Sequence, residues 1–225
     1  MRTLANKKMQ QSKLLKSDIF GEIRIISTDD GDMIVRDTNS ASVWIGWLAR
    51  ALMRREARIL ALLDGLHGVP ALLDLSRTRL RRQFVAGLPL QEAKPADPAY
   101  FKAAAQLLRK LHRLGVAHND LAKEPNLLLT VAGQPAFLDF QLAVTSRRRG
   151  RVFRILAYDD IRHLLKHKRT YCPQALSQRE QRILDNPSCL AKTWMQTIKP
   201  VYLFVTRRVL GWSDRDGAVD RGRVD

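Results

Sequence analysis

The chain has 225 residues, 45% of them hydrophobic and 27% charged, which suits one folded domain, or one domain of two lobes, and excludes a disordered chain. It contains no run of eighteen apolar residues, and residues 1–16 are basic and polar. We therefore expect neither a membrane-spanning helix nor a secretory signal, and a cytoplasmic location. The formal net charge of +17 favours an anionic partner, such as nucleic acid or a membrane surface, over a face that is merely solvated.

The first half of the sequence predicts strands around one helix. Runs rich in β-branched and aromatic residues predict strands at 15–27, 33–36, 69–75 and 80–85. Apolar residues recur at helical spacing over residues 42–63, and the glycines at 65 and 68 predict the end of that helix.

The second half predicts mainly helices. Residues 100–114 form an amphipathic pattern that stops at Gly115, and the chain from Tyr158 onward is typical of helix. Between them, residues 127–131 and 136–140 predict a β-hairpin with its turn at Gly133. Strands followed by helices, with a joint near Gly87, predict an α+β chain of two lobes.

The predicted loop before this hairpin carries the chemistry. His118-Asn119-Asp120 is followed by Asn126, and Asp139 stands at the end of the next predicted strand. A phosphoryl-transfer site needs one carboxylate that accepts the proton of a hydroxyl group. It also needs an amide oxygen and a second carboxylate that hold a magnesium ion. A lone Asp and Asn at this spacing usually mark a surface loop, so the indication comes from the ordered set.

This ordered set resembles the protein-kinase-like superfamily, and within it the small RIO-like and lipopolysaccharide-core-kinase-like branches. The resemblance covers residues 15–165 and implies an antiparallel-sheet N-lobe with a helix C, and a reduced, mainly helical C-lobe. It implies a basic extension at 1–14, the N-lobe and hinge at 15–90, the C-lobe at 91–213 and a polar tail at 214–225. Nucleotide would bind in the crease between the lobes.

The resemblance also implies roles for residues of the C-lobe. Asp120 would be the catalytic base, with Lys123 as a second catalytic residue of the same loop, while Asn126 and Asp139 would hold Mg²⁺. His118 would brace the loop. An aspartate on the following helix would anchor the loop backbone, and Asp160 is the residue predicted for it.

The expected ATP-binding residues of the N-lobe depart from the family pattern. Only Gly21 remains of the glycine-rich loop, and Gly87 lies in the segment that is similar to the adenine-binding hinge. Arg36 stands where the phosphate-binding lysine is usual, with Glu56 as its partner on helix C. One hypothesis is that Lys16 supplies the missing ammonium group.

The function that these features predict is an ATP- and Mg²⁺-dependent phosphotransferase to a hydroxyl group, first of all a serine/threonine protein kinase. The first alternative is a sugar kinase of the lipopolysaccharide core, at the inner face of a membrane, for which the acceptor would be a phosphorylated saccharide. The second is a pseudokinase scaffold that binds a polyanion, which the altered glycine loop and Arg36 would favour.

Several residues outside the motif have plainer interpretations. His112, His163 and His167 are expected on helix surfaces, because they lack metal-ligand spacing. Cys172 and Cys189 are expected to be free thiols. The aromatic and basic segment 194–212 is expected to pack on the C-lobe, with an interfacial amphipathic helix as the alternative.

Overall fold

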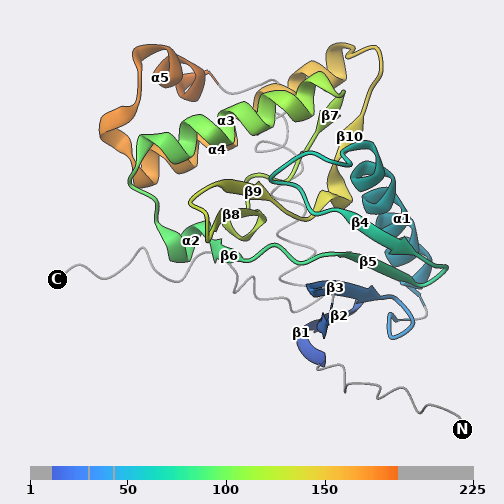
Figure 1. Ribbon diagram of the computed structural model, residues 1–225. Coiled ribbons are helices and arrows are strands. Elements are labelled where there is room, and N and C mark those ends of the chain that lie inside the picture. The colour runs from blue at the N-terminus through green and yellow to red at the C-terminus, as the bar shows by residue number, and fades with distance from the viewer. Residues whose placement is uncertain (1–11, 30, 43, 187–225) are drawn as a thin grey trace, which may run out of the picture. The chain divides into compact units, whose positions relative to one another are not determined.

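The computed structural model describes residues 12–29, 31–42 and 44–186 (Figure 1). The predictions for segment 194–212, the polar tail and Cys189 lie outside these residues. The chain divides into two compact units. The first runs to Ala86 and also includes Asp139–Leu142, and the second comprises Gly87–Leu138 and the chain from Ala143.

The first unit is an antiparallel sheet of five strands in the order β1-β2-β3-β5-β4, with one helix, α1. The bounds are β1 Ser12–Asp18, β2 Gly21–Thr28, β3 Gly31–Asp37, α1 Gly46–Leu62, β4 Leu72–Leu75 and β5 Arg79–Gln83. α1 begins four residues later than predicted, after a turn in which Ile45 N–H donates to the Ser42 carbonyl.

Helix α1 lies against β4 and β5 (Figure 1), and its buried face forms the core of this unit. Met53 and Ala57 of α1 pack with Leu80 of β5, and all three are buried. The returning segment Asp139–Leu142 also contacts α1, through a single 3-10 turn whose Phe140 is fully buried. A segment distant in sequence is therefore held by the helix that carries Glu56.

The second unit combines four helices with short strands in the described residues. The bounds are β6 Gly87–Pro89, α2 Leu90–Ala93, α3 Pro98–Arg113, β7 Val116–Ala117, β8 Leu127–Thr130, β9 Pro135–Phe137, β10 Val144–Thr145, α4 Arg151–Tyr171 and α5 Gln178–Asp185. β6, β8 and β9 form one antiparallel sheet, and β7 pairs with β10. Helices α3 and α4 lie side by side (Figure 1).

The ends of α3 follow the chemistry of its sequence. The Asp97 side chain accepts a hydrogen bond from Ala99 N–H, and Pro98 at the first helical position has no N–H to satisfy. Gly115 ends the helix with φ of +77°, and a Cβ there would lie 2.7 Å from the Ser146 carbonyl oxygen. The chain therefore turns sharply into β7 and the loop that carries Asp120.

The predicted α+β class with an antiparallel sheet first and helices second agrees with this arrangement. Cys172, the one cysteine in the described residues, is a free, buried thiol as predicted. Helices in the described part of the chain lack the combined length and apolar character needed to cross a membrane.

Candidate active site

The loop that carries Asp120 is anchored to helix α4 by one carboxylate. Asp160 is almost completely buried, and its oxygens accept hydrogen bonds from the backbone N–H groups of His118 (2.7 Å) and Asn119 (2.8 Å). The Nε2 atom of His112 lies 3.1 Å from the same carboxylate. The predicted anchoring role of Asp160 is confirmed, and these bonds hold Asn119 at a φ of +60°, a conformation that Asn tolerates better than most residues.

His118 joins this loop to the strand before Asp139. Its Nε2 atom lies 2.8 Å from the Leu138 carbonyl, which can only accept, so this nitrogen is the donor. Leu138 N–H in turn donates to the Asn126 carbonyl over 2.9 Å. The predicted bracing role of His118 is therefore confirmed. Asp139 directly follows a residue that is hydrogen-bonded to both ends of this loop, at His118 and Asn126.

Asp120, Lys123 and Asn126 are brought together within the second unit. One oxygen of Asp120, Oδ2, lies 2.9 Å from Lys123 Nζ and accepts a hydrogen bond of 2.9 Å from Asn126 Nδ2, which also donates to the Asp120 carbonyl. Asp120 Oδ1 and Asn126 Oδ1 receive no hydrogen bond from the described residues. Each is therefore an oxygen that a ligand can use.

Helix α4 supports the loop a second time, through a histidine that sequence reasoning misplaced. His167 is buried rather than exposed, its Nε2 donates to the Leu121 carbonyl over 2.8 Å, and its Nδ1 lies 3.7 Å from Glu124 Oε1. The Tyr171 hydroxyl donates a hydrogen bond to Glu124 Oε2. Burial lowers the pKa of His167, which keeps the ring neutral. The expectation that His112 and His167 are surface residues is wrong, because His112 lies against the buried Asp160 and His167 lies against the loop.

Asp139 lies in the first unit with an unusual backbone conformation. Its φ is +60°, which is rare for a residue with a side chain and recurs at functional sites. Its Oδ1 accepts a hydrogen bond of 2.7 Å from Gln141 Nε2, whereas Oδ2 receives none from the described residues. Gln141 thus orients one oxygen of the carboxylate and leaves the other for a ligand.

Arg36 and Glu56 meet in the first unit, with a second arginine that sequence reasoning missed. Glu56 is buried, and its Oε2 lies 3.8 Å from Arg36 Nη1 while its Oε1 lies 3.4 Å from Arg82 Nε. The register of the sheet could have indicated Arg82, because Ile34 of β3 pairs with Arg82, and Ile34 and Arg36 share a face. Two cations around one carboxylate leave a local excess of positive charge.

Lys16 lies in the same cross-strand row as Arg36 but does not join this cluster. Lys16 pairs with Ile23, and Ile23 pairs with Arg36, so the two basic side chains share one face of the sheet across three strands. Lys16 Nζ instead makes an ion pair of 3.2 Å with Asp18, and its side chain is 60% exposed. Whether Lys16 meets a phosphate stays a prediction.

At both glycines that are expected to contact the nucleotide, the surrounding backbone leaves no room for a side chain. Gly21 has a φ of +117° after the two-residue turn between β1 and β2, and a Cβ there would collide with the Asp37 carbonyl oxygen. A Cβ at Gly87 would lie 2.6 Å from the Leu129 carbonyl oxygen, where β6 pairs with β8. Their roles in nucleotide binding stay predictions.

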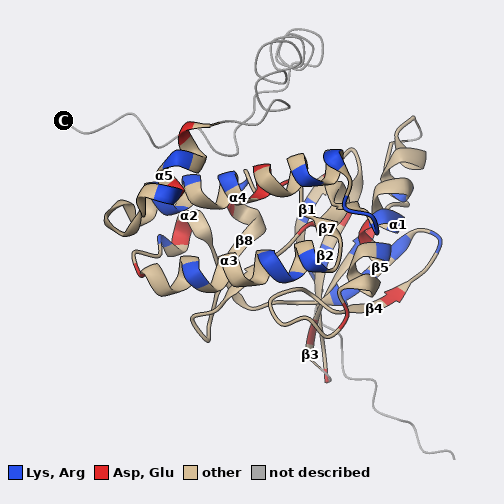
Figure 2. Cartoon of the chain, turned by 90° about the horizontal axis from the view of Figure 1, so that it is seen from above, with Lys and Arg blue, Asp and Glu red and all other residues tan. Residues whose placement is uncertain are grey.

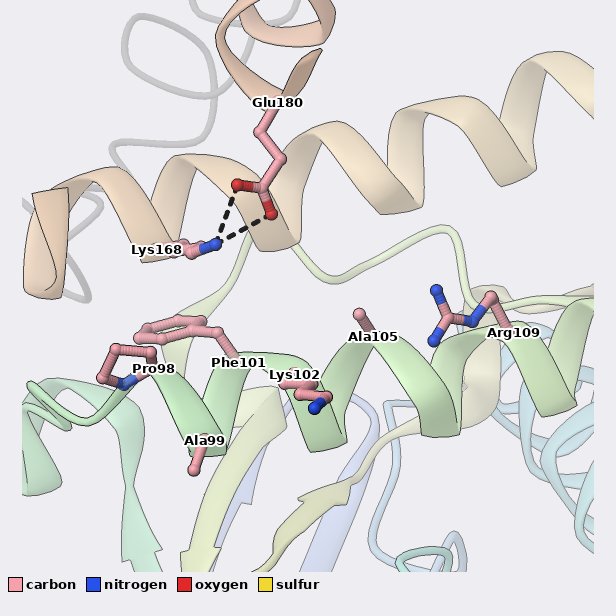
Figure 3. A pocket seen from close by; sticks show the side chains of 8 residues that line it. All are labelled: Pro98, Ala99, Phe101, Lys102, Ala105, Arg109, Lys168 and Glu180. Carbon is pink, nitrogen blue, oxygen red and sulfur yellow. Dashed lines mark hydrogen bonds and ion pairs between the residues drawn. The ribbon is translucent and has the colours of Figure 1, made fainter. Parts of the chain in front are cut away.

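A hollow of about 520 Å³ lies elsewhere in the second unit and contains none of these residues. Figure 3 shows it between the side chains of α3, from Pro98 to Arg109, and the pair formed by Lys168 and Glu180. Lys168 Nζ lies 2.8 Å from both oxygens of Glu180. Burial acts to raise the pKa of Glu180, but the hydrogen bonds from Lys168 and Ser177 outweigh it and lower the pKa below its ordinary value.

The donor chemistry of Asn126 and Asp139 suits a hard divalent cation. Each residue offers an oxygen that accepts no hydrogen bond from the described residues, and amide and carboxylate oxygens are ligands of Mg²⁺. The described residues contain no cluster of three or more His, Cys, Asp or Glu side chains able to hold a metal ion. In proteins Mg²⁺ usually binds only one or two carboxylates and completes its shell with phosphate oxygens and water.

The solved structures that are similar to this chain include two of Rio2 kinase from Chaetomium thermophilum. The first aligns with a TM-score of 0.60 at 14% identity, over 91% of this chain and 73% of that one. The second, a complex described as Rio2 kinase-ADP/Mg²⁺-phosphoaspartate, aligns with a TM-score of 0.56 at 16% identity, over 77% of this chain and 60% of that one. No protein-family model matches this chain, and no curated protein does. The chain has the α+β, protein-kinase-like fold that its sequence predicts.

Proposed function

We propose that this protein is an ATP- and Mg²⁺-dependent phosphotransferase that acts on a hydroxyl group. The observation that carries the proposal is the state of Asp120, whose Oδ2 is held by Lys123 and Asn126 while Oδ1 accepts no hydrogen bond from the described residues. A carboxylate fixed on one oxygen and available on the other is suited to orient a hydroxyl and accept its proton. The fold of a kinase with ADP and Mg²⁺ bound supports the same reading.

In the proposed reaction the acceptor oxygen forms a bond to the γ-phosphorus as the bond from that phosphorus to the ADP oxygen breaks. Asp120 Oδ1 accepts the proton of the hydroxyl, and Lys123, whose ammonium lies beside the same carboxylate, neutralises charge on the transferred phosphoryl group. Arg36 neutralises the phosphates of the nucleotide and is positioned by Glu56. Gly21 and Gly87 allow the backbone to approach the nucleotide closely.

Asn126 and Asp139 are the residues proposed to hold the magnesium ion. Support comes from the hydrogen bond between Leu138 N–H and the Asn126 carbonyl, since Asp139 is the next residue in the chain. When bound, the ion would withdraw charge from the phosphate oxygens. The side chains contribute by orientation, because Asn126 is fixed by Asp120 and Asp139 by Gln141.

Transfer of labelled phosphate from ATP tests this proposal in the parent, Asp120→Asn and Asp139→Ala proteins. We expect the Asp120 change to lower kcat at least about a hundredfold, because a base is lost, and the Asp139 change to abolish Mg²⁺-dependent turnover. Asp64→Ala, at an exposed residue of the first unit, is the matched control and should behave as the parent. Equal turnover in all four proteins would exclude Asp120 and Asp139 from the reaction.

The proposed acceptor is a serine or threonine of a protein, and the described structure contains nothing that selects it over a sugar. Incubation with labelled ATP and a lysate divided into protein, lipid and nucleic-acid fractions distinguishes a protein kinase from a lipopolysaccharide core kinase. If ATP binds without any transfer, the pseudokinase scaffold is the better description.

The neighbour that contains a phosphoaspartate motivates one further measurement on this chain. Phosphate on a serine or threonine survives hydroxylamine, whereas an aspartyl phosphate is cleaved by it. Labelled protein that loses its phosphate in hydroxylamine would show that an aspartate of this chain receives the phosphoryl group, and would replace the hydroxyl acceptor in the proposal.

A further inference from the structure

Exposed basic residues gather where the end of α3 meets the start of α4. We call this set the cationic patch, and its members are Arg109, Lys110, Arg113, Arg147, Arg148, Arg149, Arg151 and Arg154. All eight belong to the second unit and all are exposed. Figure 2 shows Lys and Arg on the neighbouring ends of the two helices and on the connection before α4.

Several contacts bring together the end of α3, the connection before α4 and the start of α4, which carry the residues of the cationic patch. The rings of His112 on α3 and Phe153 on α4 meet edge to face with their centres 6.2 Å apart. Ser146 N–H donates to the Gly115 carbonyl over 2.9 Å, which ties the start of the arginine run to the end of α3. The patch is thus built by the packing of helices and by the pairing of β7 with β10.

The charge of the patch is not neutralised within the described part of the chain. None of its eight members makes an ion pair with a described residue, whereas other basic residues do, as Lys168 does with Glu180 and Arg79 with Asp37. Residues 87–138 and 143–186 contain seventeen Lys and Arg against eight Asp and Glu, a net charge of +9. The first turn of α4 adds no acidic residue, and its N-terminal residue, Gly150, provides no side-chain cap.

Two exposed aliphatic side chains lie among these cations. Leu114, directly after Arg113, is 49% exposed, and Val152, directly after Arg151, is 65% exposed. The aromatic ring of Phe153 is buried, so it offers no surface for stacking bases. Arginines rimming exposed aliphatic groups suit a layer of lipid phosphates above hydrocarbon better than they suit a nucleic acid.

We propose that the cationic patch binds the surface of a membrane that contains anionic phospholipids. The arginine guanidinium groups would bind lipid phosphates, since their planar donors match phosphate oxygens, and Leu114 and Val152 would enter the interface. This binding is independent of the proposed phosphotransferase activity, because the patch contains none of the residues proposed for catalysis.

Sedimentation with vesicles tests the proposal on the full chain. The vesicles contain either phosphatidylcholine alone or phosphatidylcholine and phosphatidylglycerol in equal parts. We expect binding only to the second kind, weakening as salt is raised. Reversing Arg148, Arg149 and Arg151 to Glu should weaken it about a hundredfold or more, because each basic residue near an anionic surface strengthens binding about fivefold. The double variant Leu114→Ser/Val152→Ser should bind the vesicles less weakly than the triple variant does. The factor by which it weakens binding should be the same at low and high salt.

The matched control reverses three other exposed arginines of the same unit, Arg169, Arg179 and Arg182, which lie at the end of α4 and in α5. This variant has the same net charge as the first and should still sediment with the vesicles. Equal loss in both triple variants would show a response to net charge alone and would overturn the proposal. So would unchanged binding of the Arg148/Arg149/Arg151 variant, or binding to an RNA duplex with none to the vesicles, which would assign the patch to nucleic acid.

Discussion

Asp160 accepts three hydrogen bonds, the Oδ2 atom of Asp120 accepts two, and Glu56 lies between two arginines. The surroundings of each carboxylate define what it can do. Both oxygens of Asp160 accept hydrogen bonds from the backbone, whereas Oδ1 of Asp120 accepts none from the described residues. The buried position of Glu56 makes its neighbours costly to remove, because an unpaired charge would remain without water around it.

Arg82 gives a test at this scale. Arg82→Met should lower the free energy of unfolding by about 1 to 3 kcal/mol, since Glu56 would keep only Arg36, at the longer distance of 3.8 Å. Arg36→Met should lower it less and instead weaken ATP binding. Chemical denaturation and calorimetric titration with ATP measure the two effects.

Arg81→Met is the control for Arg82, because Arg81 is the neighbouring residue on β5 and is about half exposed. Among the described residues it makes an ion pair only with the exposed Asp74. Its change should cost less than about 0.5 kcal/mol. Equal effects of the Arg81 and Arg82 substitutions would show that Glu56 does not depend on Arg82.

Helix α4 is the element that supports the loop of residues 118–126. Asp160, His167 and Tyr171 are seven and then four residues apart, a spacing that places them on one face of a helix, and each bonds to the loop or to Glu124 within it. Stability of α4 and geometry of the site are therefore linked, and two histidines of this helix make that link depend on pH.

We expect the stability of the fold to fall as the pH decreases from 7 to 5. Burial, with a smaller effect of Lys166, lowers the pKa of His163 to about 4, and burial also lowers the pKa of His167. Between the ordinary pKa of about 6.5 and these lowered values the unfolded chain binds more protons, so acid favours unfolding. His163 should contribute about 2 kcal/mol over this range, and His167 should act in the same direction. Urea unfolding of the parent and of His163→Gln at both pH values measures it, and an unchanged pH dependence in the variant would contradict the assignment.

The start of α5 offers another test at the scale of the element. Glu180 forms a capping box with Ser177 and also binds Lys168 of α4. Glu180→Ala should therefore lower the free energy of unfolding by about 1 to 2 kcal/mol. Because the pKa of Glu180 is lowered in the fold, this contribution is present above the ordinary pKa of the group and disappears as the pH falls below it. Gln181→Ala, one residue later and exposed, should cost less in the same denaturation experiment.

The distribution of charge is a property of the whole molecule. Of the net charge of +17, the described residues of the second unit carry +9, and most of that excess is in the cationic patch. Like charges that are close together repel each other and oppose folding, and salt screens this repulsion. The same charge that lowers the stability of the fold would attract anionic molecules.

Added salt should raise the Tm of the parent protein for this reason. The variant with Glu at positions 148, 149 and 151 should have a higher Tm than the parent at low salt, with the difference vanishing at high salt. Thermal unfolding over a series of NaCl concentrations measures both. A lower Tm of the variant at low salt would mean that these arginines make stabilising contacts.

The sequence was sufficient to predict the main strands and helices and the loop around Asp120. These features depend on residues close together in the chain, where apolar periodicity and motif spacing act directly. The anchoring role of Asp160, which lies 42 residues from His118, was predicted from the family resemblance instead. Exact helix starts were less predictable, as the turn before Gly46 shows, because local hydrogen bonds compete with the helix at its first residues.

The sequence by itself determined which side chains are available for chemistry, since Asp120, Asn126 and Asp139 are placed by local motifs. Only the tertiary structure decided that Arg82 joins Glu56, that His167 is buried against the Leu121 carbonyl, and that two stretches of arginine form one patch. The physical reason is that such contacts depend on strand register and helix packing between segments far apart in the chain. The local pattern of residues therefore cannot predict these contacts.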